Sequence, residues 1–581
     1  MDQVISLQTL NILAGSKLLL AIFVGFFLFG YWRNPPVGGR PIYFLSIFGS
    51  LIVLFYIILA KDLRTMWWGT IGDELFVAGY LGHVMFGDAS RDFYYGWLPN
   101  FYPPLYFWLT GLVAKLFVSN GTAAAKVGIL GTLVMWFWGT YYWQKLFWSK
   151  IFKGDKNKFA IFSNDWFFVL LPILLFLLHD FGAIIFKPYE ALSGLLCVVW
   201  LIFWSVLSTE QKWSKWQYLF LGLSAGLLFL LFYFWWFILL PLIFVLALRA
   251  SDKTVQLKRF FINGILIALV SAIFWLPLLI SFIKYGIENW QAKFFVFSDL
   301  FTFNPWSALT WSSLLLLLGL GSLVYFYKTN IVVRHMAWLV ILSYFYQLIS
   351  IILYLLGYHP IQAYKPFMFL TVAALVVALA FGLIKVYQVL LVKSPDRLKI
   401  FFFVFLIILF SQLPLIRWID NPNIIQQIQN DLQPDFSSQQ LAEDIRQTVS
   451  DYQSRTWLTS GTAKLNIYLP LSYYIAFNPH FSHPATQYSQ RLAEIRAMSQ
   501  AKDSKDFINI IDQGQNPQID SLLFYDEKPS EDLGVFILNF WSDNYPNGGQ
   551  DMLIEIPKYL ISENNWQEVY NKNNWRIFLK K

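Results

Sequence analysis

The sequence predicts a polytopic α-helical membrane protein with a C-terminal extracytoplasmic domain of mixed α/β structure. The chain has 581 residues, of which 57% are hydrophobic, 20% are aromatic and only 13% are charged. An average soluble protein carries about 25% charged residues. Apolar runs long enough to cross a bilayer recur as far as residue 418, and a polar segment follows them. Together these observations exclude a soluble enzyme, a fibrous protein and a disordered chain.

About 12 transmembrane helices are predicted in residues 1–418, or 13 if the run 103–118 also crosses the membrane. The run 216–248 is too long for one span, and its glycines and aromatic break predict a tight pair of short helices. The run 103–118 is short and begins with two prolines, so we expect it not to cross fully. The other predicted spans lie at about 9–32, 41–60, 126–148, 159–178, 190–208, 260–282, 308–327, 335–356, 366–391 and 399–417.

The distribution of lysine and arginine predicts the orientation, because these residues concentrate in short cytoplasmic loops. If 12 helices alternate, every basic loop falls on one side, while the loop 61–125 and the segment 419–581 fall on the outer side. The net charge of +8 is spread over these loops and suits an anionic bilayer surface. We therefore expect the lipid bilayer as a partner and no nucleic acid.

Residues 419–581 are expected to form one soluble domain outside the membrane. A helix is predicted at Ser437–Tyr452, and strands are predicted at Leu465–Tyr474, Ser521–Tyr525 and Val535–Phe540. The domain shows no nucleophile or metal motif of its own, which favours a role in binding an acceptor or in covering the site.

Polar residues form three clusters that this topology places on the same outer face. The first follows the second predicted helix, and its acidic pair Asp73-Glu74 is the main feature. For Asp73 the alternative is a helix N-cap. For the aromatic residues 102–108 the alternative is an interface belt, and for a single lysine it is snorkelling. The candidate site residues are Arg64, Trp68, Asp73, Glu74, Tyr102, Pro103, Asp180, Lys187, Tyr189, Glu190, His359 and Lys365.

This arrangement resembles the GT-C superfamily of integral-membrane glycosyltransferases, which use polyprenyl-phosphate sugars. The extracytoplasmic acidic pair, the proline-rich start of the following helix, the second acidic site two spans later and the soluble C-terminal domain carry the resemblance. Within the superfamily the chain is most similar to the arabinofuranosyltransferases that prime cell-wall galactan in mycobacteria and corynebacteria. The motifs are Phe101-Tyr102-Pro103-Pro104, His483-Pro484 with Arg491, and Lys505-Asp506-Phe507.

The resemblance implies an inverting glycosyltransferase in the bacterial plasma membrane. The implied donor is a polyprenyl-phosphate sugar, with arabinofuranose favoured, and the implied acceptor is a cell-envelope glycan. Asp73 would take the proton of the acceptor hydroxyl, with Glu74 as its neighbour or substitute. A cation would stabilise the leaving phosphate, and the candidates are Lys365, Lys187 and Arg64.

The second acidic pair, Asp180 and Glu190, would orient hydroxyl groups of the donor or acceptor. If a divalent cation is used, the same pair could hold Mg²⁺ or Mn²⁺, although nothing in the sequence requires a metal or another cofactor. Trp68 and the aromatic residues that follow would offer stacking surfaces for sugar rings.

Two other function classes stay open at this point. A transporter or flippase of polyprenyl-linked glycans would carry ionisable residues in mid-bilayer and repeated halves, whereas the predicted spans here are almost free of charge. A scaffold with an external sensor domain would not explain why three polar clusters gather on one face.

Overall fold

A computed structural model describes most of the chain. The predicted site residues Arg64, Trp68, Asp180 and His359 lie outside the described residues, as do the predicted spans at 399–417 and most of 9–32. The described residues are 14, 15, 18, 22, 41–62, 72–178, 181–288, 310–358, 362, 365–393, 436–461, 463–527, 534–543 and 549–581.

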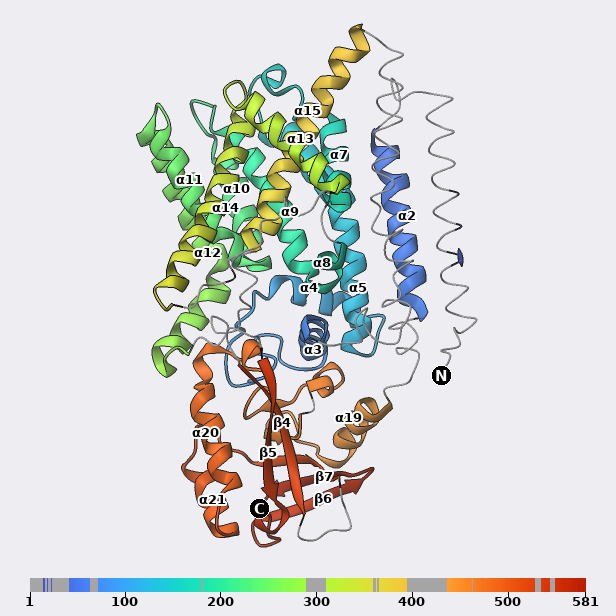
Figure 1. The fold of residues 1–581 in the computed structure, drawn as a ribbon, viewed down its shortest axis with the longest axis vertical. Helices are drawn as coiled ribbons and strands as arrows, with labels where there is room; N and C mark the ends of the chain where they lie inside the picture. Colours follow the sequence, from blue (N-terminus) through green and yellow to red (C-terminus); the bar gives the residue numbers. More distant parts are fainter. Residues whose placement is uncertain are drawn as a thin grey trace.

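The chain folds into a long helical membrane domain with an α/β domain at one end (Figure 1). Six described helices are long and apolar enough to cross a membrane, and a seventh span results if the bent pair α10–α11 is counted as one. The predicted fold class, a polytopic helical protein with a C-terminal α/β domain, is confirmed. The described helices of the membrane domain are α2 (Pro41–Asp62), α3 (Gly72–Phe86), α4 (Leu105–Ala114), α5 (Gly121–Val134), α6 (Thr140–Leu146), α7 (Asp165–Leu178), α8 (Phe181–Phe186), α9 (Pro188–Leu207), α10 (Lys215–Leu231), α11 (Trp236–Arg249), α12 (Lys253–Tyr285), α13 (Trp311–Phe326), α14 (Ile331–Leu355) and α15 (Val372–Lys393).

Helices α10 and α11 confirm the tight pair predicted for 216–248. The chain turns by 120° between them, at a 3-10 turn over Tyr233–Trp235. The glycines before the turn have a different role from the expected one, because they do not mark the break. A Cβ atom on Gly222 would lie 2.5 Å from Leu266 Cβ, and one on Gly226 would lie 2.5 Å from Val270 Cβ. Both glycines therefore allow α10 to pack closely against α12.

Helix α4 agrees with the prediction that the run 103–118 does not fully cross the membrane, because it is too short to span. It has 10 residues, which corresponds to about 15 Å, or half the thickness of the hydrocarbon core. Helix α7 begins later than the predicted span at 159, because the Asn164 side chain accepts a hydrogen bond from Trp166 N (2.9 Å) and so marks the start of the helix.

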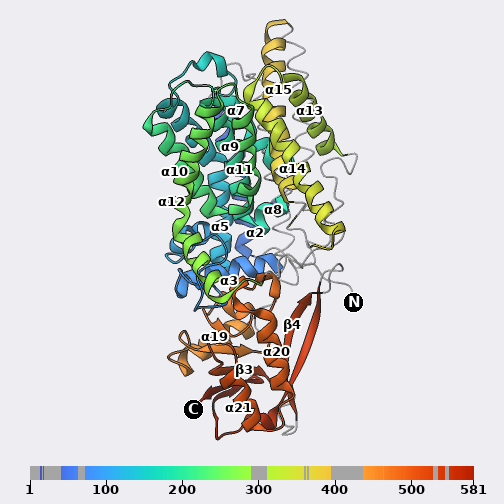
Figure 2. The ribbon, with the colours of Figure 1, turned by 90° about the vertical axis from the view of Figure 1, so that its left-hand side faces the viewer.

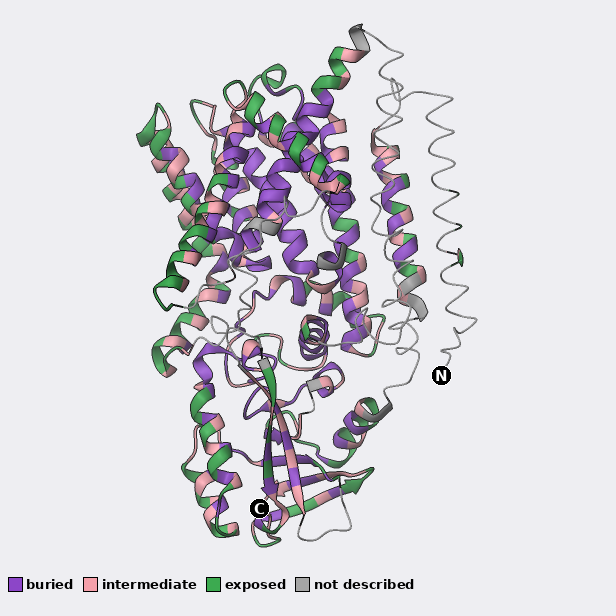
Figure 3. Cartoon of the chain, viewed as in Figure 1, coloured by how far each residue is buried: buried purple, intermediate pink, exposed green. Residues whose placement is uncertain are grey.

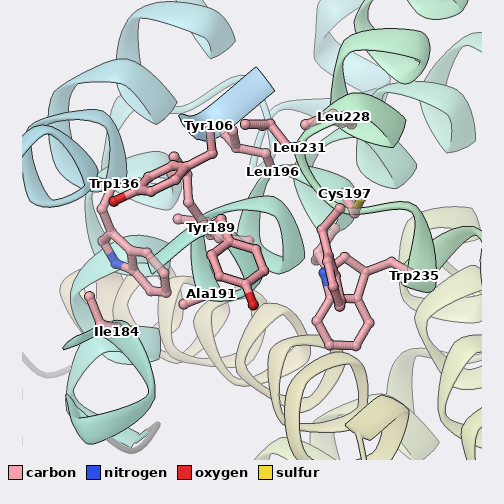
Figure 4. Packing of buried hydrophobic residues seen from close by; sticks show 14 of the residues in the cluster. Tyr106, Trp136, Ile184, Tyr189, Ala191, Leu196, Cys197, Leu228, Leu231 and Trp235 are labelled. Atoms are coloured by element: carbon pink, nitrogen blue, oxygen red, sulfur yellow. The ribbon is translucent and has the colours of Figure 1, made fainter. Parts of the chain in front are cut away.

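Helix α9 is the centre of the membrane domain. All of its residues are buried (Figure 3), whereas only 28% of the spanning part of α12 and 33% of that of α14 are buried. Helices α12 and α14 are therefore outer helices. Figure 4 shows Tyr189 and Leu196 of α9 among Trp136, Leu231 and Trp235 from the surrounding elements. This packing holds the start of α9, which carries Lys187 and Glu190, in one position.

The C-terminal domain contains a five-stranded sheet of order β2-β1-β3-β7-β6 and a separate hairpin, β4–β5. Strand β1 runs parallel to β2 and β3, and the pairs β3–β7 and β6–β7 are antiparallel. The elements are α19 (Phe436–Thr448), β1 (Thr456–Thr459), β2 (Ser472–Tyr473), α20 (Tyr488–Ser499), α21 (Ser504–Gln513), β3 (Ser521–Tyr525), β4 (Val535–Asp543), β5 (Gly549–Pro557), β6 (Trp566–Lys572) and β7 (Trp575–Lys580).

One predicted strand of this domain is wrong. The stretch Leu465–Tyr474 begins inside a 3-10 helix, Ala463–Ile467, and only Ser472–Tyr473 is a strand. The apolar alternation arises because this helix packs against α3 of the membrane domain: a Cβ atom on Gly82 would lie 2.5 Å from Asn466 O. The apolar alternation in this stretch therefore reflects a contact between the two domains. It does not come from a strand with one buried face.

The two domains are joined by hydrogen bonds between buried groups. Asn466 Nδ2 donates to Phe93 O (3.2 Å), Ala476 N donates to Tyr95 Oη (2.8 Å), and the same hydroxyl pairs with Ser482 Oγ (2.8 Å). Figure 2 shows α3 at this boundary, between the membrane helices and the C-terminal domain. Residues of both domains can therefore contribute to one site.

Candidate active site

A cavity of 210 Å³ lies where the two domains meet. Its walls combine the starts of α3, α9 and α15 with the turn between α10 and α11 and with the segment 480–484 of the C-terminal domain. The lining residues are Asp73, Phe76, Phe101, Tyr102, Lys187, Tyr189, Glu190, Phe232, Tyr233, Phe234, Phe237, Phe282, Ile287, Gln362, Lys365, His480, Phe481 and Pro484.

Asp73 is the most accessible carboxylate of the cavity, with 35% of its side chain exposed. Helix α3 begins at Gly72, so Asp73 lies inside the first turn and not at the N-cap position. Its Oδ2 atom lies 3.0 Å from Lys187 Nζ. The carboxylate thus faces the cavity and a cation, which favours a functional role over helix capping.

Lys187, Glu190 and Lys365 continue the chain of opposite charges. Glu190 Oε1 accepts a hydrogen bond from Lys365 Nζ (2.7 Å) and lies 4.0 Å from Lys187 Nζ. The side chains of Glu190 and Lys365 are only 3% and 6% exposed. Lys365 is therefore a buried, paired cation and does not snorkel to the membrane surface. Charges alternate along the row Asp73, Lys187, Glu190, Lys365.

The surroundings shift the pKa values of two of these groups. Burial raises the pKa of the Asp73 carboxyl, but the nearby Lys187, His480 and Lys365 act in the opposite direction and hold it below its ordinary value. Burial lowers the pKa of the Lys365 ammonium to about 8, with Glu190 opposing the shift and Lys187 adding to it. At neutral pH Asp73 is ionised and Lys365 is protonated.

Three helices direct their N-termini at the cavity. Asp73 is in the first turn of α3, and Lys187 immediately precedes α9. Lys365 lies one residue before Pro366, the N-cap of the π turn Phe367–Thr371 that leads into α15. A helix N-terminus carries partial positive charge and unpaired N–H groups, which favour an anion. With two lysines in addition, this part of the cavity is suited to a phosphate group.

Aromatic rings line the cavity beside these charged groups. Lys365 Nζ lies 5.1 Å from the centre of the Phe232 ring and 5.8 Å from that of Phe234. Phe76 lies 4.3 Å from Tyr102 between ring centres. Such surfaces accept the apolar faces of sugar rings or the first units of a lipid chain.

The C-terminal domain supplies a part of the wall that the sequence did not predict. Phe481 stacks on Phe76 of α3, with ring centres 5.2 Å apart and an interplanar angle of 12°. His480 lines the cavity beside it. Burial, followed by the positive charge of Lys187, lowers the pKa of His480 to about 4, with Asp73 opposing the shift, so this imidazole is neutral at neutral pH. Its histidine spacing fits no metal motif, and only the nearby His483-Pro484 motif pointed to the region.

The structure brings six of the predicted site residues together, namely Asp73, Tyr102, Lys187, Tyr189, Glu190 and Lys365. Two others lie near the cavity but do not line it. Pro103 is buried, and Glu74 is fully buried on the side of α3 where it interacts electrostatically with Tyr56 of α2. The geometry separates the roles of the acidic pair, because only Asp73 faces the cavity.

The described part of the cavity does not fit a divalent cation. Its carboxylates, Asp73 and Glu190, are each within ion-pairing distance of a lysine, and the ammonium groups would repel a metal ion. Among the residues that the structure describes, no group of three His, Cys, Asp or Glu side chains could hold a metal. Of the two carboxylates that could hold a divalent cation if one were used, Glu190 is paired with Lys365, and Asp180 lies outside the described residues.

Comparison with known proteins bears most directly on the C-terminal domain. Residues 428–570 match the family described as "Arabinofuranosyltransferase A C terminal". The C-terminal domain is similar to that of arabinofuranosyltransferase A. The match confirms the predicted resemblance for this part of the chain, which contains His483-Pro484, Arg491 and Lys505-Asp506-Phe507. The matched region includes His480, Phe481 and Pro484, so the part that resembles arabinofuranosyltransferase A also lines the cavity.

Two solved structures of ArnT from Cupriavidus metallidurans are similar over nearly the whole chain. The apo structure aligns with 90% of this chain and 99% of its own, and the structure bound to undecaprenyl phosphate aligns with 92% and 97%. Each has 12% sequence identity and a TM-score of 0.49. No curated protein sequence gives a significant match.

Proposed function

We propose that this protein is an inverting glycosyltransferase that moves a sugar from a polyprenyl-phosphate donor to a cell-envelope glycan. The observation that carries the proposal is the composition of the cavity. One accessible carboxylate, Asp73, faces two lysines and three helix N-termini. The similarity of the C-terminal domain to arabinofuranosyltransferase A supports the same reaction class and favours arabinofuranose as the sugar.

The two lysines of the cavity would hold the donor phosphate. Lys187 and Lys365 lie at the starts of α9 and of the helix leading to α15, where the helix dipoles add to their charge. As the bond between the anomeric carbon and the phosphate oxygen breaks, negative charge grows on the phosphate. Positive groups that are already in place stabilise this charge without reorganisation. Since phosphate is a good leaving group, no general acid is needed.

The accessible carboxylate, Asp73, would activate the acceptor. An acceptor hydroxyl attacks the anomeric carbon from the face opposite the phosphate, a new glycosidic bond forms, and the hydroxyl proton passes to Asp73. Because Asp73 is ionised at neutral pH, it can accept this proton without a prior deprotonation step. A single displacement inverts the anomeric configuration. Polyprenyl phosphate is the second product.

We propose that the reaction takes place on the extracytoplasmic face of the plasma membrane. The basic loops near 208–211, 249–256 and 327–334 share one cavity. Helix α12 runs from that end to the C-terminal domain, where Glu288 N donates to Pro484 O (2.8 Å). The basic loops and the C-terminal domain thus lie at opposite ends of the membrane domain, and basic loops are typical of the cytoplasmic side.

A reporter fused after Lys581 is expected to be active only outside the cytoplasm. A phosphatase that folds only outside the cytoplasm and a fluorescent protein that folds only inside provide opposite signals. As a control, the same reporters inserted in the loop after α9 should give the reverse pattern. A cytoplasmic signal at Lys581 would contradict the orientation and, with it, the location of the site.

The reaction itself is tested by transfer with purified protein in detergent. Polyprenyl-phosphate arabinofuranose, mannose and glucose are offered separately with a mixed cell-envelope glycan, and the product linkage is determined by mass spectrometry and NMR. Product with one donor and inverted anomeric configuration would support the proposal. Transbilayer movement of a lipid-linked glycan in vesicles, without product from any donor, would favour a transporter.

The transfer rate is expected to fall as the pH rises through about 8, because Lys365 loses its proton near that pH. Transfer needs a cation at this position. The active form of Lys365 is therefore the protonated one, which is present below its pKa. No loss is expected between pH 5 and neutrality on account of Asp73, whose pKa lies below its ordinary value. The Lys365→Arg variant should lose this alkaline decline, because arginine stays protonated. An unchanged profile would contradict the role of Lys365.

A further inference from the structure

A second cavity, of 510 Å³, lies within the C-terminal domain. It is a groove between α20 and the hairpin β4–β5, which run side by side toward the membrane domain (Figures 1 and 2). Its volume is within the range of ligand-binding cavities. The groove lies outside the residues that hold the donor in the proposed mechanism.

The groove and the catalytic cavity are separated by a single peptide bond. Pro479 lines the groove, and the next residue, His480, lines the catalytic cavity. The Ser489 amide at the start of α20 donates to Glu288 Oε2 (3.0 Å), directly after α12. The Trp541 amide donates to Phe477 O (3.0 Å) and fixes the hairpin beside the segment that leads to His480. The two cavities are therefore neighbours along this segment of the chain.

The side chains of the groove suit a neutral, hydroxyl-rich ligand. The indole nitrogen Nε1 of Trp541 is buried and has no hydrogen-bond partner among the described residues, although a buried indole N–H usually has one. Arg496 and Asp551 contribute one charge of each sign, and Gln550 adds an amide. The side chains that line the groove therefore carry no net charge.

Apolar surface accompanies these polar groups. Leu492, Met552 and the Trp541 ring line the same groove. An apolar floor with planar hydrogen-bonding groups around it matches a sugar ring, which presents C–H groups on its faces and hydroxyls at its edges. Arg496 and Asp551 are exposed, so a ligand can reach them without displacing buried structure.

We infer that this groove binds the acceptor glycan at sugars remote from the reacting end, and that the acceptor passes Pro479–His480 into the catalytic cavity. The inference rests on the proposed function, since it assigns the groove to the acceptor of that reaction. It accounts for the balanced charge, the combination of apolar and polar lining and the adjacency of the two cavities.

The test measures binding separately from transfer. Full-length Asp73→Asn protein in detergent, without donor, is titrated by calorimetry with neutral galactofuranose oligosaccharides from disaccharide to octasaccharide. Affinity is expected to rise with length. In the same background Arg496→Gln, Asp551→Asn and Trp541→Phe should each weaken binding of the octasaccharide, by about tenfold for Arg496→Gln, and leave disaccharide binding unchanged. Lys505→Gln, on α21 outside the groove, is the matched control for Arg496→Gln.

Each outcome is decisive. Length-dependent binding that the groove variants abolish supports the inference even if no donor supports transfer, in which case the proposed function alone fails. Affinity that is independent of length, or unchanged in Arg496→Gln and Asp551→Asn, overturns the inference. Binding of an anionic phospholipid vesicle or of a peptide in place of the neutral glycan, with loss in the same variants, overturns it as well.

Discussion

Replacing Asp73 with asparagine is expected to slow sugar transfer by a factor of about 10²–10⁴. The amide retains the shape of the side chain but cannot take a proton from the acceptor hydroxyl. Since the Asp73 side chain is 35% exposed, the variant should insert and fold like the wild type. The measurement is single-turnover transfer with saturating donor, so that the chemical step is observed directly.

Two controls separate this effect from a general loss of charge. Asp88→Asn alters an exposed carboxylate, 62% accessible, that pairs with Arg91 on the loop after α3, and its transfer rate should equal that of the wild type. Glu74→Gln alters the buried neighbour that faces α2, so it should lower thermal stability more than the rate of the chemical step. Normal turnover by Asp73→Asn, or a larger kinetic effect of Glu74→Gln, would exclude Asp73 as the base.

Replacing Lys365 with methionine is expected to reduce both stability and transfer. The ammonium pairs with Glu190 at 2.7 Å, and both side chains are nearly inaccessible. Removing one partner of a buried ion pair leaves the other charge without compensation, which costs about 3–5 kcal/mol. Lys187, 4.0 Å from Glu190, compensates part of this cost, so the lower end of the range is expected. The measurement is the denaturation midpoint in detergent.

A double variant distinguishes the structural role of Lys365 from its functional role. In Glu190→Gln/Lys365→Met the buried charge is absent, so most of the stability should return. Transfer should stay low, because the cation near the leaving phosphate is still missing. Lys385→Met, at an exposed position of α15, should change neither quantity. Recovery of transfer in the double variant would show that Lys365 serves only to neutralise Glu190.

The membrane domain could be predicted well from the sequence, because its main signal is local. An apolar run such as 190–208 has to be helical to satisfy its backbone in lipid, and α9 occupies Pro188–Leu207. The break between α10 and α11, at Tyr233–Trp235, could also be predicted from the sequence. The exact ends of helices could not be predicted where a capping side chain determines them, as at the start of α7.

The membrane half of the site followed from topology. Once the basic loops fix the orientation, the residues before α9 and α15 and those at the start of α3 must lie on one face. Asp73, Lys187 and Lys365 do meet there. The sequence could not separate Asp73 from Glu74, because the direction of a side chain in a first helical turn depends on the packing of the whole helix.

The half of the site from the C-terminal domain could not be predicted. His480 and Phe481 approach α3 from about 400 positions away in the chain, and no local pattern encodes that contact. The same cause explains the wrong strand at Leu465–Tyr474. Its apolar residues face another domain, and a periodicity argument assigns them to the core of their own domain.

The stacking of Phe481 on Phe76 has a consequence for how the protein is made. The ribosome completes residues 72–86 long before residue 481, so a nascent chain passes through a stage in which α3 exists and its partner ring does not. During that stage the cavity lacks the part of its wall that residues 480–484 supply. The site is therefore complete only after the C-terminal domain has been synthesised and has folded against α3.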